Sequence, residues 1–147
     1  MSRIELSCIG SVSDGEAFGI PHPNKNEVVP YWISNASGAN FHKIKVLGLQ
    51  AKSLTAEGGT ITVRIKAKDI NDHSVVGKYG NDSSATDITI AELTLSLNNL
   101  DKVEYVTDWI MASSNITDEK LIYGEFSVVG ELDVQQVYVW VDYENIS

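Results

Sequence analysis

Residues 59–68 read GTITVRIKAK, and from Ile61 to Lys68 apolar and polar side chains alternate without a break. In an extended strand, successive side chains point to opposite faces, so this alternation puts the apolar side chains on one face and the cations on the other. A helix would need apolar residues three or four positions apart, and this stretch lacks that spacing. The stretch therefore predicts a β-strand with one buried and one solvent-facing side.

A second stretch, residues 137–143, reads VYVWVDY and is apolar on both faces. Val137, Val139 and Val141 share one face, whereas Tyr138 and Trp140 share the other. Such a strand is either central in its sheet or covered by a partner.

Six further segments show period-two alternation and are expected to be strands. They are Arg3 to Val12, Glu27 to Ile33, Phe41 to Ser53, Asp87 to Leu97, Lys102 to Ile110 and Leu121 to Val129. Clusters of turn-forming residues separate the segments, as in all-β proteins. We therefore expect one domain over residues 1–147, an all-β, antiparallel two-sheet β-sandwich that is jelly-roll-like and has eight or nine strands.

Local breaks in the alternation predict irregularities within these strands. The apolar phase slips near Ile90 and again beside Gly48, and each slip predicts a β-bulge or bend. Glu57-Gly58-Gly59 reads as a hairpin turn. Residues 107–112 are ambiguous, because they would also suit a single helical turn.

The overall charge limits the classes of partner. The formal net charge is -9 and the sequence contains one cysteine, Cys8, which we expect to be buried. Nucleic acid and acidic membrane surfaces attract clustered Lys and Arg, so we expect neither as a partner. The start of the sequence lacks an export signal and no long apolar run follows, so we expect synthesis in the cytoplasm and no membrane span.

The sequence offers no motif for catalysis. Its three histidines, His22, His42 and His73, lie too far apart for the short spacings that bring imidazoles onto one metal. A nucleophile elbow and a phosphate-binding glycine loop are also missing. We therefore expect a protein that is not an enzyme and that carries no metal or cofactor.

The longest irregular segment, residues 69–86, is a candidate functional loop. Its polar candidates are Asp69, Asn71, Asp72, His73 and Asp82. They superficially resemble a calcium loop but lack the glycine and the terminal glutamate that complete one. A carbohydrate-binding or receptor-binding module would use such a loop or an exposed aromatic residue, and this is the alternative function.

Charge is unevenly distributed along the chain, because residues 1–80 carry a net +2 and residues 81–147 a net -11. Cations recur at every second position, at Lys43, Lys45, Arg64, Lys66 and Lys68. If their two strands are neighbours, they form one basic strip. Either these faces are simply solvated, or the strip and the exposed side of Tyr138 and Trp140 contact the acidic side of another subunit.

The segments Lys43 to Leu49, Thr60 to Lys68 and Val137 to Tyr143 give the chain an architecture that resembles jelly-roll structural proteins of viruses. The resemblance is greatest to trimeric head-decoration (cement) proteins of tailed bacteriophages. It implies a non-enzymatic homo-oligomer, a trimer, that binds a capsid lattice. It also implies a location on the virion surface after synthesis in the host cytoplasm.

Overall fold

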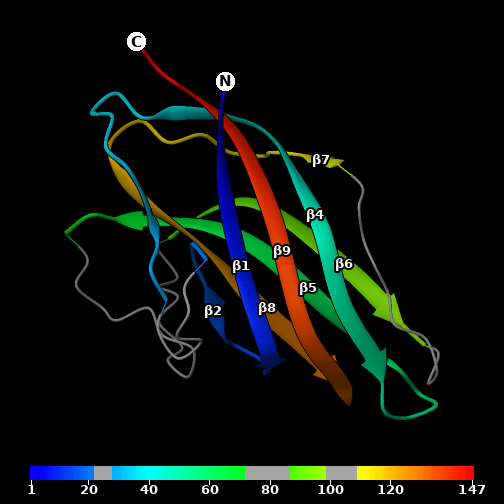
Figure 1. Cartoon of the computed structure of the whole chain (residues 1–147). Coiled ribbons are helices and arrows are strands. Elements are labelled where there is room, and N and C mark those ends of the chain that lie inside the picture. Colours follow the sequence, from blue (N-terminus) through cyan, green and yellow to red (C-terminus); the bar gives the residue numbers. More distant parts are fainter. Residues whose placement is uncertain (22–27, 72–86, 99–108) are drawn as a thin grey trace.

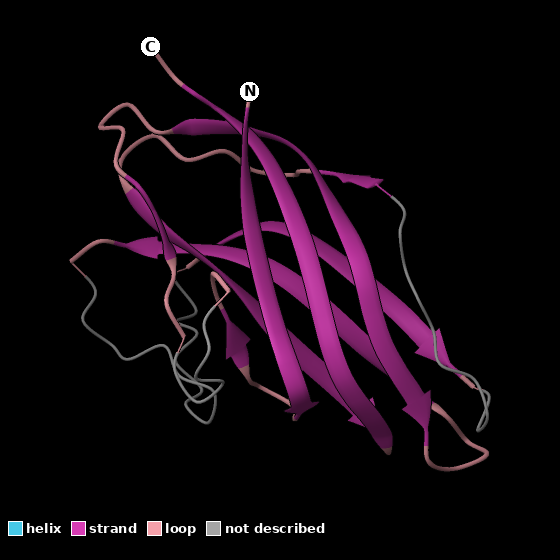
Figure 2. Cartoon of the chain, viewed as in Figure 1, coloured by secondary structure: helices cyan, strands magenta, loops and turns pink. Residues whose placement is uncertain are grey.

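The structure is a computed structural model that describes residues 1–21, 28–71, 87–98 and 109–147. These residues form nine strands and no helix, so no helix among them could cross a membrane (Figures 1 and 2). The strands are β1 (Ser2–Val12), β2 (Ala17–Phe18), β3 (Tyr31–Ile33), β4 (Ala39–Ser53), β5 (Gly59–Asp69), β6 (Ile88–Leu97), β7 (Trp109–Met111), β8 (Lys120–Gly130) and β9 (Leu132–Asn145).

Two antiparallel sheets make up the fold, and Figure 1 shows β1, β9 and β4 side by side in front of β8, β5 and β6. The first sheet, sheet A, has the order β1-β9-β4-β7. The second, sheet B, has the order β2-β8-β5-β6, and β3 also pairs with β8. Without β3, this is the strand order of an eight-stranded jelly roll. The predicted fold class, antiparallel pairing and strand number are confirmed.

Apolar side chains on the facing sides of the two sheets form one core. The predicted strand in residues 59–68 contributes Ile61, Val63 and Ile65, all buried, while Thr62 and Arg64 on its other side remain partly exposed. Phe18 from the two-residue strand β2 fills the core beside Phe126, with ring centroids 4.8 Å apart. The alternation of the sequence thus corresponds to an inward and an outward face.

The strand that is apolar on both faces is central in its sheet. β9 lies between β1 and β4, where Val139 pairs with Leu6 on one side and with Val46 on the other. Val139 is fully buried in the core, and its neighbour Trp140 lies on the outer face of sheet A. The first of the two explanations offered for this strand, a central position, therefore holds.

Both predicted slips in the alternation coincide with irregular pairing. The register between β4 and β9 shifts between Val46 and Gly48, and the register of β5 with β6 shifts between Ile65 and Lys66, opposite Ala91 and Thr89. An extra residue in one strand moves its next side chain to the other face. The two bulges thus explain why the apolar phase changes within each strand.

The predicted hairpin at Glu57-Gly58-Gly59 is wrong. This turn leads from β4 in sheet A to β5 in sheet B, so it joins two sheets and does not join paired strands. Gly58 has a φ of 70°, and a Cβ there would lie 2.2 Å from the carbonyl oxygen of Leu97. The close approach and the left-handed backbone both require glycine at this crossing.

The single basic strip is also contradicted, because its two strands are not neighbours. Lys43 and Lys45 lie in β4 of sheet A, whereas Arg64 and the cations that follow it lie in β5 of sheet B. Side chains on the two outer faces of a sandwich point away from each other. The two groups of cations therefore belong to different surfaces.

Residues 109–111 settle the ambiguity in the segment from 107 to 112. Trp109, Ile110 and Met111 form β7, paired with Lys45, Ile44 and Lys43 of β4. A helical turn at these three residues is therefore wrong. Residues 102–108 of the strand expected there lie outside the described residues.

Candidate functional site

The outer face of sheet A gathers aromatic and cationic side chains from four strands. Across the sheet, Glu5 pairs with Trp140, Trp140 with Lys45, and Lys45 with Trp109. In the adjacent row, Arg3 pairs with Asp142, Asp142 with Lys43, and Lys43 with Met111. We call the surface made by Arg3, Lys43, Lys45, Trp109, Met111 and Trp140 the aromatic face.

The cations of the aromatic face cover its indole rings. The Arg3 guanidinium carbon lies 4.0 Å from the centre of the Trp140 ring, and Lys43 Nζ lies 4.2 Å from that of Trp109. Lys45 Nζ is 5.3 Å from the Trp109 ring. Cation–π contacts of this length hold positive charge directly above apolar surface. Met111 is 77% exposed at the edge of the same surface.

One carboxylate lies beneath these cations. Asp142 is buried and accepts two hydrogen bonds from Arg3, from Nε to Oδ1 at 2.7 Å and from Nη2 to Oδ2 at 3.1 Å. These hydrogen bonds hold the pKa of Asp142 below its ordinary value of 3.8. The carboxylate thereby fixes the guanidinium in the plane from which it covers Trp140.

Tyr138 and Trp140, the two predicted interface residues of β9, differ in their polar contacts. The Tyr138 hydroxyl donates a hydrogen bond to Glu5 Oε2 at 2.9 Å, and partial burial together with Glu5 raises the pKa of Tyr138. The Trp140 Nε1 atom is buried and has no hydrogen-bond partner in the described part of the chain. Trp140 therefore contributes apolar ring surface to the face, while its N–H is buried away from solvent.

The cations of β5 make contacts within their own molecule. Arg64 donates to Glu92 Oε2 at 2.9 Å, and Lys66 Nζ lies 3.9 Å from Glu125 Oε2. Lys66 is buried, and Lys68 is only 1% exposed, with its Nζ 5.9 Å from the centre of the Tyr123 ring. Of the five predicted interface cations, Lys43 and Lys45 thus belong to the aromatic face, and the other three lie in sheet B.

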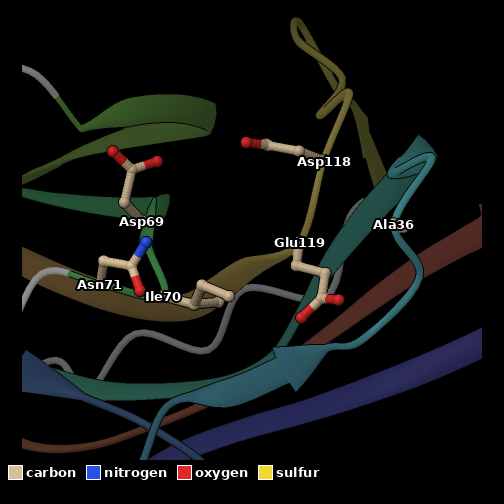
Figure 3. A pocket seen from close by; sticks show the side chains of 6 residues that line it. All are labelled: Ala36, Asp69, Ile70, Asn71, Asp118 and Glu119. Carbon is tan, nitrogen blue, oxygen red and sulfur yellow. The ribbon is translucent and has the colours of Figure 1, made fainter.

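A separate notch lies where β5 ends and β8 begins. It has a volume of about 390 Å³ and is lined by Ala36, Asp69, Ile70, Asn71, Asp118 and Glu119. Figure 3 shows Asp69 and Asn71 on one side, and Asp118 and Glu119 on the other. We call it the acidic notch.

Two side chains, Lys120 and Trp32, organise the acidic notch. Lys120 bonds to Asp69 and lies 3.0 Å from Asp118; burial lowers its pKa, but the hydrogen bonds to the two carboxylates raise it above the ordinary 10.5 overall. Trp32 is 58% exposed and donates from Nε1 to Glu119 Oε2 at 3.1 Å. The notch therefore combines acceptor oxygens with a neighbouring flat aromatic surface.

The predicted functional loop is only partly described. The structure places Asp69 and Asn71 in the acidic notch, whereas Asp72, His73 and Asp82 lie outside the described residues. In the segments that the structure describes, no three His, Cys, Asp or Glu side chains form a group that could hold a metal ion.

No protein-family model matches the chain, and no curated protein sequence matches it either. The jelly-roll strand order is common to capsid, lectin and cupin domains, so the fold alone does not assign a function.

Sequence reasoning missed three members of the aromatic face: Arg3, Trp109 and Met111. Trp109 and Met111 are two positions apart, so a strand at residues 109–111 would have placed them on one face. The pairing of Arg3 with Asp142 required the register between the first and last strands. Register depends on tertiary packing, so no local pattern signals that contact.

Proposed function

We propose that this chain is a non-enzymatic structural protein, an oligomeric decoration protein that stabilises a viral head through protein–protein contacts. The oligomer we expect is a trimer, bound to the outer surface of the capsid lattice. This proposal combines the jelly-roll order of the strands with one surface, the aromatic face. Jelly rolls are frequent in capsid proteins.

The aromatic face is the observation that supports a protein partner. Trp, Met and Arg are enriched at the centres of protein interfaces, and here Trp109, Met111 and Arg3 lie together on one rigid sheet. Interface energy usually concentrates in a few such aromatic and arginine side chains. The pairing of β7 with β4 and of β1 with β9 also holds these side chains in place before binding, which lowers the entropic cost of association.

The charges on this face favour an acidic protein surface over nucleic acid. Arg3 is already paired with Asp142, and Glu5 lies in the same sheet, so little cationic charge remains for phosphates. Nucleic acid binding needs many unpaired Lys and Arg side chains that follow a backbone. A protein partner needs only a few complementary charges around an apolar centre.

The first experiment measures assembly and lattice binding separately. Sedimentation velocity of the purified chain at low and at high salt should show a trimer, and the chain should cosediment with virus-sized particles purified from its native source. The variant Trp109→Ala/Met111→Ala should lose particle binding, because it removes the apolar centre of the face.

The matched control is Thr94→Ala/Ser96→Ala, which removes two exposed side chains from the outer face of sheet B. It should bind particles like the unmodified chain. A chain that remains monomeric at both salt concentrations and binds no particle would overturn the proposal. Particle binding that survives Trp109→Ala/Met111→Ala would assign the contact to another surface.

One observation favours a second function, binding of carbohydrate at the acidic notch. Sugars stack on exposed aromatic rings and donate hydroxyl hydrogens to carboxylates. Trp32 offers an exposed ring, and its partner Glu119 lines the notch beside Asp118. The same chain would then act as a receptor-binding module.

A glycan array, probed with and without calcium, tests this second function. Binding that Trp32→Ala abolishes and Trp109→Ala leaves unchanged would support it. An array without a specific signal under either condition would exclude a glycan as the ligand, and would leave the decoration function to be judged by sedimentation.

A further inference from the structure

The end of the sandwich distant from the aromatic face carries acidic side chains around exposed apolar residues, and this complements the cations and aromatic rings of that face. Its exposed apolar residues are Leu54 and Val129, at 54% and 66% exposure, and four carboxylates lie on the turns and strand ends around them. We call this surface, made by Asp14, Leu54, Glu57, Val129, Glu131 and Asp133, the acidic end.

Backbone contacts bring these turns together. The Leu54 amide donates to the Glu131 carbonyl at 2.8 Å, and Thr60 pairs with Val129. The Asp14 carboxylate accepts a hydrogen bond from the Val128 amide at 2.8 Å, which places the first turn of the chain at the same end. Lys52, opposite Asp133, is the nearest described cation in the strand register and offsets only part of this charge.

The aromatic face and the acidic end cannot meet within one molecule. Lys45 pairs with Trp140, and Lys52 pairs with Asp133, on the same two strands. Seven residues of β4 separate the two positions, which corresponds to about 23 Å at a strand rise of about 3.3 Å per residue. That distance exceeds the Debye length of about 8 Å at physiological salt, so their charges do not attract within the chain.

We infer that the aromatic face of one copy binds the acidic end of the next copy. This inference rests on the proposed function, since it names the contact that builds the oligomer. Lys43 and Lys45 meet carboxylates of the partner, while Trp109 and Met111 cover Leu54 and Val129 of the partner. Apolar surface and opposite charge are matched on both sides of the contact.

A symmetric contact between two aromatic faces is disfavoured. It would place Lys43 and Lys45 against the same two lysines of the other copy, and like charges brought together across an interface cost free energy. A contact between two different surfaces is head-to-tail, and such contacts form closed rings when the rotation between copies permits. A closed ring is therefore an assembly that this contact supports, and the proposed trimer is one such ring.

Two charge variants test the contact by complementation. The first, Lys43→Glu/Lys45→Glu, reverses the charge of the aromatic face; the second, Glu57→Gln/Glu131→Gln, neutralises the acidic end. Each variant alone should self-associate at least about tenfold more weakly than the unmodified chain. An equimolar mixture should form a heterodimer that grows no further, because each partner retains only the surface that the other lacks.

The control Thr94→Glu/Ser96→Glu adds two carboxylates to the exposed side of β6 and should assemble like the unmodified chain. Thermal unfolding of each variant shows whether it still folds. If the unmodified chain assembles and both charge variants assemble equally well, this contact is wrong and the decoration function still stands. If the unmodified chain is monomeric and binds no particle, the proposed function fails together with the contact.

Discussion

Arg3 and Asp142 join the first and last strands of the fold through two parallel hydrogen bonds, although 139 positions separate them in the sequence. The pair lies on the outer face of sheet A, with the carboxylate buried and the guanidinium above Trp140. It therefore ties the aromatic face to the pairing of β1 with β9.

Asp142→Asn should destabilise the fold near neutral pH and much less in acid. A hydrogen-bonded carboxylate of this kind contributes ~1 kcal/mol when its cationic partner remains partly exposed. Because the folded pKa of Asp142 lies below 3.8, its contribution is present above that value and is lost as pH falls through the folded pKa. Urea unfolding of both proteins at about pH 7 and about pH 2.5 measures the difference between their free energies of unfolding, which should be smaller in acid. An equal difference at both pH values would contradict the role assigned to the carboxylate.

Tyr143, whose hydroxyl oxygen lies 3.0 Å from that of Tyr31, should titrate late. Burial, and then the hydrogen bond to Tyr31, raise the pKa of Tyr143 to about 12. A raised folded pKa means that the contribution to stability is complete below the ordinary value of 10.0 and is lost as pH rises toward about 12. Ultraviolet absorbance of tyrosinate follows this titration, and Tyr31→Phe should lower the late pKa. An unchanged late titration in Tyr31→Phe would assign the shift to burial alone.

Gly124→Ala should be strongly destabilising because Phe18 lies directly over Gly124. A Cβ at this position would lie 2.0 Å from Phe18 Cζ. Forcing the ring aside costs about 1 to 3 kcal/mol, as overpacking in cores does. Gly48→Ala is the matched control, since its Cβ would find its nearest neighbour, Gln136 Nε2, at 3.8 Å. Denaturant midpoints compare the two, and Gly124→Ala combined with Phe18→Leu should recover part of the loss.

Met111→Ala and Val139→Ala should separate binding from stability. Met111 is largely exposed, so its removal should change the free energy of unfolding by less than about 0.5 kcal/mol and should weaken self-association. Val139 is fully buried in the core, so Val139→Ala should cost about 2 kcal/mol. Calorimetry and sedimentation velocity on the same samples give both quantities. A large loss of stability in Met111→Ala would mean that the face is part of the fold and not a free surface.

The local alternation of apolar and polar residues was sufficient to predict the long strands and the bulges within them. The alternation around Val63 and the phase slip at Gly48 are direct results of side-chain geometry, so both could be predicted from the sequence. Strand β2 could not, because Ala17 and Phe18 are too few residues to show a period.

Long-range arrangement could not be predicted from the same patterns. The turn at Gly58 has the composition of a hairpin, yet it crosses between sheets, and Leu49 and Ile61 reach the single core from different sheets. The burial of Lys68 on the outer side of β5 likewise depends on tertiary packing and not on its neighbours in sequence. The candidate site was therefore found only in part, through Lys43, Lys45 and Trp140.

The central position of β9 has a consequence for synthesis. Among the described strands, β9 is the one neighbour that β1 and β4 share, so these two strands cannot be joined in sheet A until Leu132–Asn145 have emerged from the ribosome. Contacts between segments so far apart in the sequence form slowly, because closing the long loop between them costs conformational entropy. During translation the nascent chain therefore exposes the unpaired edges of two long strands, and its yield should depend on chaperones that bind such edges before release.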